Sequence, residues 1–315
     1  MNTDGKKLSF SRAASVNRQR VTKQFHQFSF KVETVKAAGA VFLLLAIACC
    51  HAAEPAADRS NIPYKTDAAL SDYEKQRCVL DLCLPTGRQD FATLVWFHGG
   101  GLTGGSKDGA DTKMLAQSLA QAGVGVVVPN YRLSPKATYP AYIQDAAAAV
   151  AWTRAHIAEH GGDKARLFIG GHSAGGYLTL MLGLDPHYLQ DLGVPPAAIA
   201  GLIPVSGQTM THYTVRAERG LGKFSVTADE AAPVYFARKN TPPMLVLYAD
   251  HDMAARAEEN AYLVALLKGA DNPRVTGQMI ADRTHGSIAS KIADEGDPAR
   301  LAILQFIKGS PALHP

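Results

Sequence analysis

The chain has 315 residues, of which 47% are hydrophobic and 19% are charged, so its length and composition suit one large α/β domain or two small ones. The formal net charge is +4, but residues 1–36 hold eight Lys or Arg and only two acids. In the remainder, acidic side chains outnumber basic ones. The basic character therefore belongs to the first segment, and we expect no nucleic-acid partner.

The range 1–53 has the plan of a secretory signal peptide. An uncharged apolar run, 37–50, follows the basic segment, and the small residues Ala52 and Ala53 come after it. The run is shorter than the about 20 residues that a membrane-spanning helix needs. We therefore predict export to the periplasm or the extracellular space. A later start of translation, for example at Val35, would give this leader an ordinary length.

The four cysteines divide into two pairs. Cys49 ends the sequence Ala-Ile-Ala-Cys, which is loosely similar to a lipoprotein box, so a lipid anchor at Cys49 is the alternative to a cleaved leader. Such an anchor is the one membrane contact that we expect. Cys78 and Cys83 lie in an extended run at a spacing that directs their side chains to opposite sides of a strand. We interpret both as packed thiols and not as a redox or metal pair.

From residue 54 onward, apolar strand and helix patterns alternate. We interpret 54–75 as a linker and N-terminal extension and 76–315 as one catalytic domain. The expected strands are 76–85, 93–97, 124–129, 166–169, 198–205, 243–248 and 275–280. The expected helices are 111–123 with Asp111 as its N-cap, 140–160, 254–268 and a last one ending near Lys308. The alternation predicts an α/β fold, a mainly parallel central sheet flanked by helices on both faces. The range 207–240 breaks it, and we predict that this range is a cap insertion over the site.

The stretch 169–177 reads Ile-Gly-Gly-His-Ser-Ala-Gly-Gly-Tyr and lies between an apolar strand and a helix-compatible run. It contains Gly171-x-Ser173-x-Gly175, and a strand, a tight turn and a helix are the context that a nucleophile elbow requires. The glycines let the strand and the helix approach closely around a serine in a strained conformation. We therefore predict that Ser173 is a nucleophile whose hydroxyl projects above the sheet.

An activated serine needs a base and an acid that orients it, and both are expected at the ends of strands. Asp250 and Asp252 follow the strand 243–248. We favour Asp252, because a carboxylate farther into the loop can reach a histidine of the next loop; Asp250 is the alternative. His285 follows the last strand and is the predicted base. His251 competes with it but is too near Asp252 in sequence to face it well. The histidine inside the elbow is interpreted as a spacer under the serine.

A glycine-rich turn, Gly99-Gly100-Gly101, follows the buried strand 93–97. Two of its amides, with the amide of Ala174 after the elbow serine, could bind the oxyanion of a tetrahedral intermediate. A phosphate cradle is the rival interpretation, but no Lys-Ser/Thr pair follows the glycines. The sequence also has no dinucleotide fingerprint and no His/Cys cluster with metal spacing. We therefore expect neither a cofactor nor a metal.

From about Leu80 to the end, the chain resembles the α/β-hydrolase superfamily. More narrowly, it is similar to esterases of the hormone-sensitive-lipase-like and kynurenine-formamidase-like group, in the stretches 96–101 (Trp-Phe-His-Gly-Gly-Gly), 130–133 (Asn-Tyr-Arg-Leu) and 171–176 (Gly-His-Ser-Ala-Gly-Gly). The resemblance implies the following site: nucleophile Ser173, base His285, acid Asp252, and an oxyanion hole of Gly100, Gly101 and Ala174. Three residues depart from the family's usual pattern: Leu102 after the glycines, Ala249 before the acid loop, and Gly286 after the histidine.

These patterns predict a secreted serine hydrolase that cleaves small-molecule carboxylic esters of short to medium acyl chain through an acyl-enzyme. Acetyl or feruloyl esters of plant polysaccharides are a possible subset, given the predicted export. Hydrolysis of arylformamides is the near alternative, since the same machinery cleaves activated amides. A catalytically silent hydrolase fold that only binds is the distant alternative, and it would lack one member of the triad. The sequence leaves the oligomeric state open.

Overall fold

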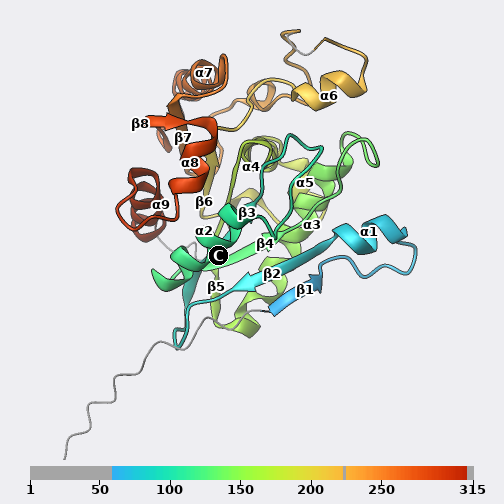
Figure 1. Cartoon of the computed structure of the whole chain (residues 1–315), viewed down its shortest axis with the longest axis vertical. Helices are drawn as coiled ribbons and strands as arrows, with labels where there is room; N and C mark the ends of the chain where they lie inside the picture. Colours follow the sequence, from blue (N-terminus) through green and yellow to red (C-terminus); the bar gives the residue numbers. More distant parts are fainter. Residues whose placement is uncertain (1–58, 223–224, 311–315) are drawn as a thin grey trace, which may run out of the picture. The chain divides into compact units, whose positions relative to one another are not determined.

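In the computed structural model, residues 59–222 and 225–310 are described. The predicted leader 1–53, the alternative start Val35 and the candidate lipid site Cys49 lie outside these residues. Within the described part, eight strands form one sheet in the order β1-β2-β4-β3-β5-β6-β7-β8 (Figure 1). The strands are β1 (Arg59–Pro63), β2 (Val79–Cys83), β3 (Phe91–Phe97), β4 (Gly125–Pro129), β5 (Gly162–His172), β6 (Gly201–Val205), β7 (Met244–His251) and β8 (Val275–Thr284).

The sheet is mainly parallel. The pairs from β4–β3 through β7–β8 are parallel, whereas β2 pairs antiparallel with both β1 and β4. In a parallel sheet with helical connections, the carboxyl ends of the strands meet at one edge. The residues that follow β3, β5, β6, β7 and β8 are therefore brought to the same edge of this sheet.

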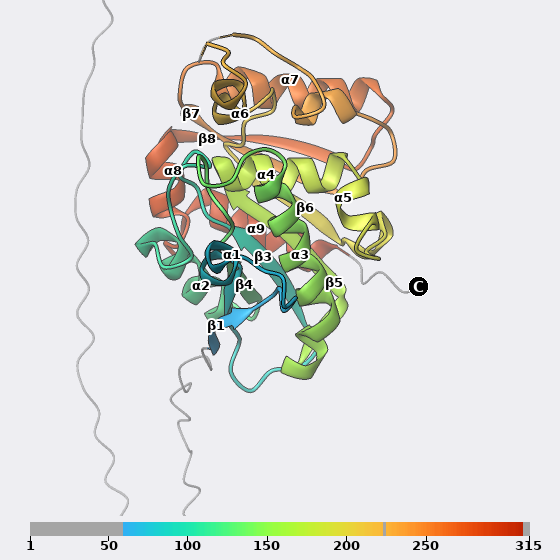
Figure 2. The same cartoon turned by 90° about the vertical axis from the view of Figure 1, so that its right-hand side faces the viewer.

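Helices cover both faces of the sheet (Figures 1 and 2). The helices are α1 (Asp72–Arg77), α2 (Ala110–Gln121), α3 (Ala141–His156), α4 (Ala174–Leu184), α5 (His187–Gln190), α6 (Tyr213–Glu218), α7 (Arg256–Gly269), α8 (His285–Lys291) and α9 (Pro298–Gly309). The buried apolar side chains of α3, α4 and α7 join one core cluster, and those of α2, α8 and α9 join another. This arrangement confirms the predicted α/β fold with helices on both faces.

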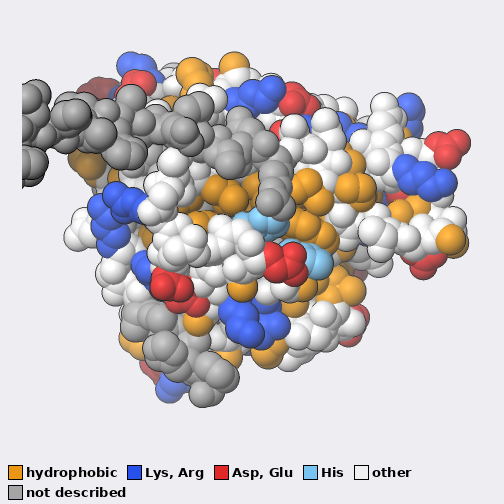
Figure 3. Space-filling model, turned by 90° about the horizontal axis from the view of Figure 1, so that it is seen from below, with side chains coloured by type: hydrophobic (Ala, Val, Ile, Leu, Met, Phe, Trp, Pro, Cys, Tyr) orange, Lys and Arg blue, Asp and Glu red, His pale blue; other side chains and the backbone are white. Residues whose placement is uncertain are grey.

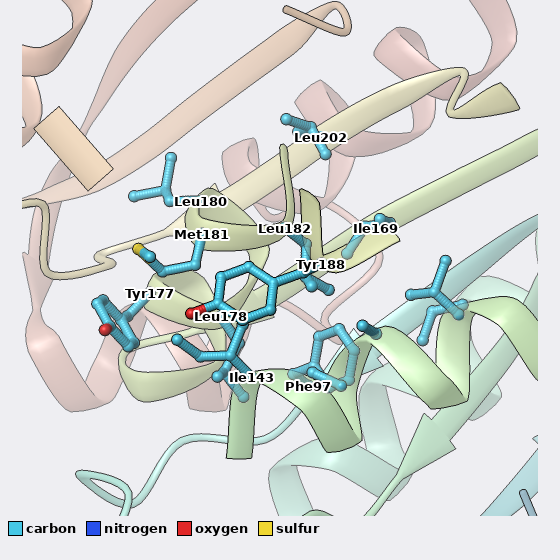
Figure 4. Packing of buried hydrophobic residues seen from close by; sticks show 14 of the residues in the cluster. Phe97, Ile143, Ile169, Tyr177, Leu178, Leu180, Met181, Leu182, Tyr188 and Leu202 are labelled. Atoms are coloured by element: carbon cyan, nitrogen blue, oxygen red, sulfur yellow. The ribbon is translucent and has the colours of Figure 1, made fainter. Parts of the chain in front are cut away.

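Strand β3 shows how one strand serves both cores. Val95 and Phe97 belong to the cluster with α3 and α4, whereas Leu94 and Trp96 belong to the cluster on the opposite face. The alternation follows from the two-residue period of a strand. Figure 4 shows part of the first cluster, in which Phe97 lies with Ile143 of α3 and with apolar side chains of α4. The glycine-rich turn thus leaves a strand that is buried along its whole length.

The N-terminal part of the domain differs most from the prediction. The expected linker 54–75 contains β1 and the start of α1, and the strand expected over 76–85 begins only at Val79. Helix α1 carries a complete capping box, Ser71 with Glu74, which stabilises so short a helix. The Ser-x-x-Glu pattern of this capping box is a helix-start signal in the sequence itself.

Three further differences are local. Helix α2 is capped by Gly109 and not by the predicted Asp111, which lies in its first turn. The helix expected over 140–160 ends at His156 and continues as a short 3-10 turn, Ile157–His160. Helix α8, which begins at His285, was not predicted. Its first-turn residues include glycine and serine, whose weak helix propensity hides it in the sequence.

The described cysteines are packed as predicted. Cys78 and Cys83 are both buried, and neither forms a disulfide. They belong to different core clusters, on opposite faces of the sheet. No helix of the described residues has the length and hydrophobicity that crossing a bilayer requires. On the face drawn in Figure 3, basic and acidic side chains are interspersed among uncharged ones.

Candidate active site

Ser173 occupies a strained turn between β5 and α4. Its backbone angles are φ 57° and ψ −115°, a conformation that non-glycine residues rarely adopt. Its amide donates to the carbonyl of Val205, 2.9 Å away, at the end of the neighbouring strand β6. A Cβ atom on Gly175 would lie 2.0 Å from the carbonyl oxygen of Phe97, and one on Gly171 would lie 2.6 Å from the carbonyl of Gly175. The backbone contacts therefore require these two glycines, and the predicted elbow is present.

The structure brings Ser173, His285 and Asp252 together. The Nε2 atom of His285 lies 2.8 Å from the Ser173 Oγ, and its Nδ1 atom lies 2.6 Å from the Asp252 Oδ1. The histidine begins α8 directly after β8, and the aspartate directly follows β7. These are hydrogen-bond distances. The hydroxyl can thus give its proton to an imidazole that a carboxylate orients.

The geometry separates Asp250 from Asp252. The carboxylate of Asp250 accepts the backbone amides of Asp282 and Arg283, at 2.8 and 2.9 Å, and so holds the end of β8. The carboxylate of Asp252 faces the imidazole instead. His251, the competing base, is 71% exposed in its side chain and lies 3.6 Å from the Asp250 carboxylate. Asp250 therefore fixes the end of the strand that leads to His285, whereas Asp252 contacts the His285 imidazole.

Asp252 has a second partner that the sequence analysis did not identify. The hydroxyl of Ser206 donates to the Asp252 Oδ2, 2.5 Å away, leaving Oδ1 for His285. The aspartate side chain has no exposed surface. Burial alone raises the pKa of Asp252, but the hydrogen bonds from His285 and Ser206 outweigh it and hold the pKa below its ordinary value. The carboxylate is therefore ionised where it faces the imidazole.

Ser206 is itself held by the backbone around it. It follows β6, and its φ of 50° is positive, which is uncommon for serine. Its amide donates to the carbonyl of Leu247 on β7, and its carbonyl accepts the buried Arg256 guanidinium at 3.1 Å. Arg256 is paired with Glu259 at 2.8 Å. The only sequence signal for Ser206 is its place at the end of a parallel strand, where polar residues of a site gather.

His172 lies beneath the elbow, as predicted for a spacer. Its Nε2 atom is 2.9 Å from the carbonyl oxygen of His285, and the two rings are 4.7 Å apart. Burial lowers the pKa of His172 to about 3, so the ring is neutral. Since a carbonyl only accepts, Nε2 carries the hydrogen and donates it. His172 therefore fixes the backbone of the histidine loop.

Of the three amides predicted for the oxyanion hole, two lie in the glycine-rich turn and one lies at the start of helix α4. Gly100 and Gly101 have φ values of 116° and 65°, and the carbonyl of Gly100 accepts the amides of Thr103 and Gly104 within the turn. Ala174 is the first residue of α4, where helical amides lack an internal acceptor. No acceptor within the described residues pairs with the amides of Gly100, Gly101 or Ala174. These N–H groups are therefore available to a bound oxygen.

The predicted cap segment contacts the glycine-rich turn. Thr214 of α6 donates its hydroxyl to the carbonyl of Gly101. The hydroxyl of Tyr213 would lie 1.9 Å from a Cβ atom on Gly101, so any side chain at 101 would have to displace the tyrosine. In Figure 1, α6 lies in the part of the molecule that also holds α7. The segment 207–240 thus forms one wall beside the turn.

Helix α1 supports the same turn from another side. Arg77 of α1 donates to the carbonyls of Tyr131 and Gly105, at 2.9 and 3.3 Å. The hydroxyl of Tyr131 donates in turn to the carbonyl of His98, at 2.7 Å, and the two rings stack with 4.3 Å between their centroids. The Asn-Tyr-Arg-Leu stretch seen in the sequence therefore supports the turn. Among the described residues, no cluster of metal-ligating side chains is found.

A serine, an imidazole and a carboxylate at the carboxyl edge of a mainly parallel sheet, with the serine on a strand–turn–helix elbow, define the α/β-hydrolase class of fold and site. The family model described as alpha/beta hydrolase fold matches residues 94–289, and the chain belongs to this family.

Named relatives fall in the same class. The chain is 33% identical over 150 residues to Carboxylesterase NlhH of Mycobacterium tuberculosis, which covers 48% of this chain and 43% of the relative. It is 33% identical over 176 residues to the probable carboxylic ester hydrolase LipM of the same organism, covering 50% of this chain and 41% of the relative. The chain thus spans less than half of the length of these relatives.

Solved structures share the fold. A truncated form of a carbohydrate esterase from gut microbiota has a TM-score of 0.67 and 18% identity, covering 82% of this chain and 97% of that one. An esterase of Pyrobaculum calidifontis has a TM-score of 0.57 and 22% identity, covering 73% of this chain and 79% of that one. At these identities, the likeness shows the fold alone.

Proposed function

We propose that this protein is a carboxylic ester hydrolase that works through a serine acyl-enzyme. The observation that carries the proposal is the chain of hydrogen bonds from the Ser173 hydroxyl through His285 to the Asp252 carboxylate, at 2.8 and 2.6 Å. The relatives from Mycobacterium tuberculosis, named as a carboxylesterase and a carboxylic ester hydrolase, support the same class of reaction.

In the proposed first half-reaction, the Ser173 Oγ attacks the ester carbonyl carbon as its proton passes to the Nε2 of His285. Asp252 holds the Nδ1–H and stabilises the imidazolium that forms. The negative charge on the former carbonyl oxygen is bound by the amides of Gly100, Gly101 and Ala174. The tetrahedral intermediate then collapses, the C–O bond to the alcohol breaks, and the alcohol oxygen takes the proton from His285.

In the second half-reaction, water attacks the acyl carbonyl while His285 takes a proton from it. The same amides bind the second oxyanion. Collapse of this intermediate breaks the bond to the Ser173 Oγ, which recovers its proton from the imidazolium. The acid leaves, and the site returns to its starting state. A donor of an oxyanion hole typically contributes about 10²–10³ in rate, so the glycine turn is a large part of the proposed catalysis.

We propose esters of short to medium acyl chain as substrates, with acetyl or feruloyl esters as a subset. The glycine turn supports this, since it carries no side chains next to the serine. The close approach of Gly99 to the elbow also supports it: a Cβ atom there would lie 3.4 Å from the Cβ of Ser173. The turn therefore leaves room for a short acyl group beside the serine.

Labelling with a fluorophosphonate probe tests the proposed nucleophile. We expect one adduct, found by mass spectrometry on the peptide that holds Ser173, and no adduct in Ser173→Ala. His285→Ala should slow labelling by about 10³-fold or more, because the hydroxyl loses its base. Labelling that persists in Ser173→Ala, or that is unaffected in His285→Ala, would contradict the proposal.

A substrate panel tests the acyl range. We expect p-nitrophenyl acetate and butyrate to be cleaved with higher kcat/KM than the octanoate or longer esters. An N-formyl arylamine belongs in the panel, since the same triad could cleave it. If kcat/KM is higher for the formamide than for every ester, the protein is an arylformamidase and the ester assignment is wrong.

A further inference from the structure

A cavity of about 330 Å³ lies beside the proposed nucleophile. It is bounded by Gly99 and Gly100 of the glycine turn, by His172 under the elbow, and by Gly286, which directly follows His285. Its volume is at the lower end of the range for small-molecule sites. Ser173 and His285 do not line the cavity themselves, but their chain neighbours His172 and Gly286 do, so the cavity lies next to the proposed catalytic residues.

Gly286 adds no side chain to the wall of this cavity. A Cβ atom built on Gly286 meets no heavy atom within 4 Å, in contrast to the crowded glycines of the elbow. The residue lies in the first turn of α8, where its backbone is helical and any side chain could be accommodated. A large side chain at 286 would therefore occupy space beside His285 without distorting the backbone.

The lining of the cavity has two chemical characters. One part is apolar and comes from the side chains of Trp96, Leu115 and Ile292. Another part is polar and comes from His98, Ser106 and Asp111. A ligand that presents hydroxyl groups on one side and C–H groups on the other matches such a lining.

The polar part offers one accessible acceptor group, the carboxylate of Asp111. The Nδ1 of His98 lies 2.6 Å from the carbonyl oxygen of Gly99, so Nδ1 carries the hydrogen and Nε2 has the lone pair. Burial lowers the pKa of His98 to about 4, so the ring is neutral. Its Nε2 atom is buried and has no hydrogen-bond partner among the described residues, so the ring does not offer it to a ligand. Asp111 is exposed, and its carboxylate would accept hydrogen bonds from hydroxyl donors and repel an anionic ligand.

We propose that this cavity binds the alcohol part of the substrate and that this alcohol is a neutral polyol or a monosaccharide. This inference rests on the proposed function and deepens it. The leaving oxygen takes its proton from the Nε2 of His285, so the alcohol lies on the side of the histidine. Helix α8 begins at His285 and carries Gly286 into the cavity wall.

The test compares acetates that differ only in the alcohol: ethyl acetate, glycerol monoacetate and a monoacetylated methyl glycoside. Initial rates in a pH-stat give kcat/KM for the wild type, for Gly286→Phe and for Asp111→Asn. Gly296→Phe is the matched control, because a Cβ on Gly296 also meets nothing within 4 Å but Gly296 does not line the cavity. Ethyl butyrate is added to detect an effect on the acyl side.

We expect the wild type to prefer at least one polyol acetate over ethyl acetate by about tenfold or more. Gly286→Phe should remove most of this preference, Asp111→Asn should reduce it, and Gly296→Phe should keep it. The two polyol acetates distinguish an open-chain polyol from a sugar ring. Thermal unfolding shows whether each variant is folded, and Asp111→Asn, a change on an exposed side chain, gives a second reading if Gly286→Phe does not fold.

Three outcomes would overturn the inference. The first is a wild type with no preference for a polyol acetate, and the second is a preference that survives both substitutions. The third is a Gly286→Phe variant whose kcat/KM for ethyl butyrate falls relative to that for ethyl acetate. The last would assign the cavity to the acyl group. Failure of the proposed function is a different result, since it would show as no ester turnover at all and no fluorophosphonate labelling of Ser173.

Discussion

The elbow and the segment 207–240 both border the proposed site, and contacts of different kinds hold them. At the elbow, backbone meets backbone: Cβ atoms on Gly171, Gly175 or Gly176 would lie less than 3.0 Å from main-chain atoms. Beyond Gly207, whose backbone meets Gly176, side chains from elsewhere in the chain also hold the segment 207–240, such as Tyr139, whose hydroxyl donates to the carbonyl of Glu230. The close backbone contacts at the elbow require glycines, which a short sequence motif shows. The side-chain contacts of the segment 207–240 depend on partners that lie far away in the sequence.

Gly175→Ala should have the largest effect, because it removes the close backbone contact between α4 and β3 that defines the elbow. The new methyl group would lie 2.0 Å from the carbonyl oxygen of Phe97, so β3 and α4 must move apart. We expect about 3 kcal/mol less stability in urea unfolding and a kcat lower by about 10²-fold. Gly296→Ala, where a Cβ meets nothing within 4 Å, is the control and should change stability by less than about 0.5 kcal/mol. Equal effects of the two changes would show that the elbow is not sterically constrained.

Ser206→Ala tests the junction between the two regions, where a side chain positions the acid. Without the hydroxyl, the pKa of Asp252 rises, since one of the hydrogen bonds that lower it is lost. A carboxyl with a depressed pKa stabilises the fold above its unfolded-state value of about 3.9, and that contribution disappears as the pH falls through the folded value. In the variant, we therefore expect both activity and stability to decline at a higher pH than in the wild type.

At neutral pH, we expect kcat/KM of Ser206→Ala to be about tenfold lower, since the acid is less firmly placed. Ser206→Gly is the matched variant: it also lacks the hydroxyl but relieves the positive φ of 50°. Both variants should share the shifted pH profile while differing in stability. A pH profile identical to that of the wild type would show that Ser206 does not influence the pKa of Asp252 and has only a structural role.

Thr214→Val addresses the contact of α6 with the glycine turn. Valine keeps the shape of the side chain but cannot donate to the carbonyl of Gly101. We expect a loss of about 1 kcal/mol in stability and a kcat about threefold lower, because the turn is less well fixed. Thr209→Val removes a similar hydrogen bond, to the carbonyl of Glu259, away from the turn. Thr209→Val should lower stability by a similar amount and leave kcat unchanged. If its kcat also fell about threefold, the contact of Thr214 with the turn would have no special role in catalysis.

Arg219→Gln should have the smallest effect. Arg219 pairs with Asp229 and Glu230, both at 2.7 Å, and closes the segment 207–240 on itself. Ion pairs that are partly exposed contribute about 0.2–1 kcal/mol each. We expect a fall in Tm of a few degrees at low salt, with the difference from the wild type shrinking as salt is added. A fall that is independent of salt would point to lost packing by the arginine stem and not to charge.

The sequence predicts best what short-range sterics and strand order determine. Ser173 is defined by its own turn, and the positions of Asp252 and His285 follow from the rule that parallel strands end at one edge. Ser206 was missed, because a hydroxyl after a strand carries no motif and only the fold shows that it reaches Asp252. Strand β1 was missed for a similar reason. Its residues Arg59–Pro63 read as polar linker, and their pairing with β2 depends on tertiary structure.

The placement of Cys78 and Cys83 has a practical consequence. Two thiols in separate cores on opposite faces of a sheet cannot meet without unfolding, so within residues 59–222 and 225–310 no cystine contributes to stability. We infer that this body folds equally well in reducing and in oxidising surroundings. Expression in an ordinary bacterial cytoplasm, and assays in the presence of dithiothreitol, should therefore give protein of the same stability as material produced under oxidising conditions.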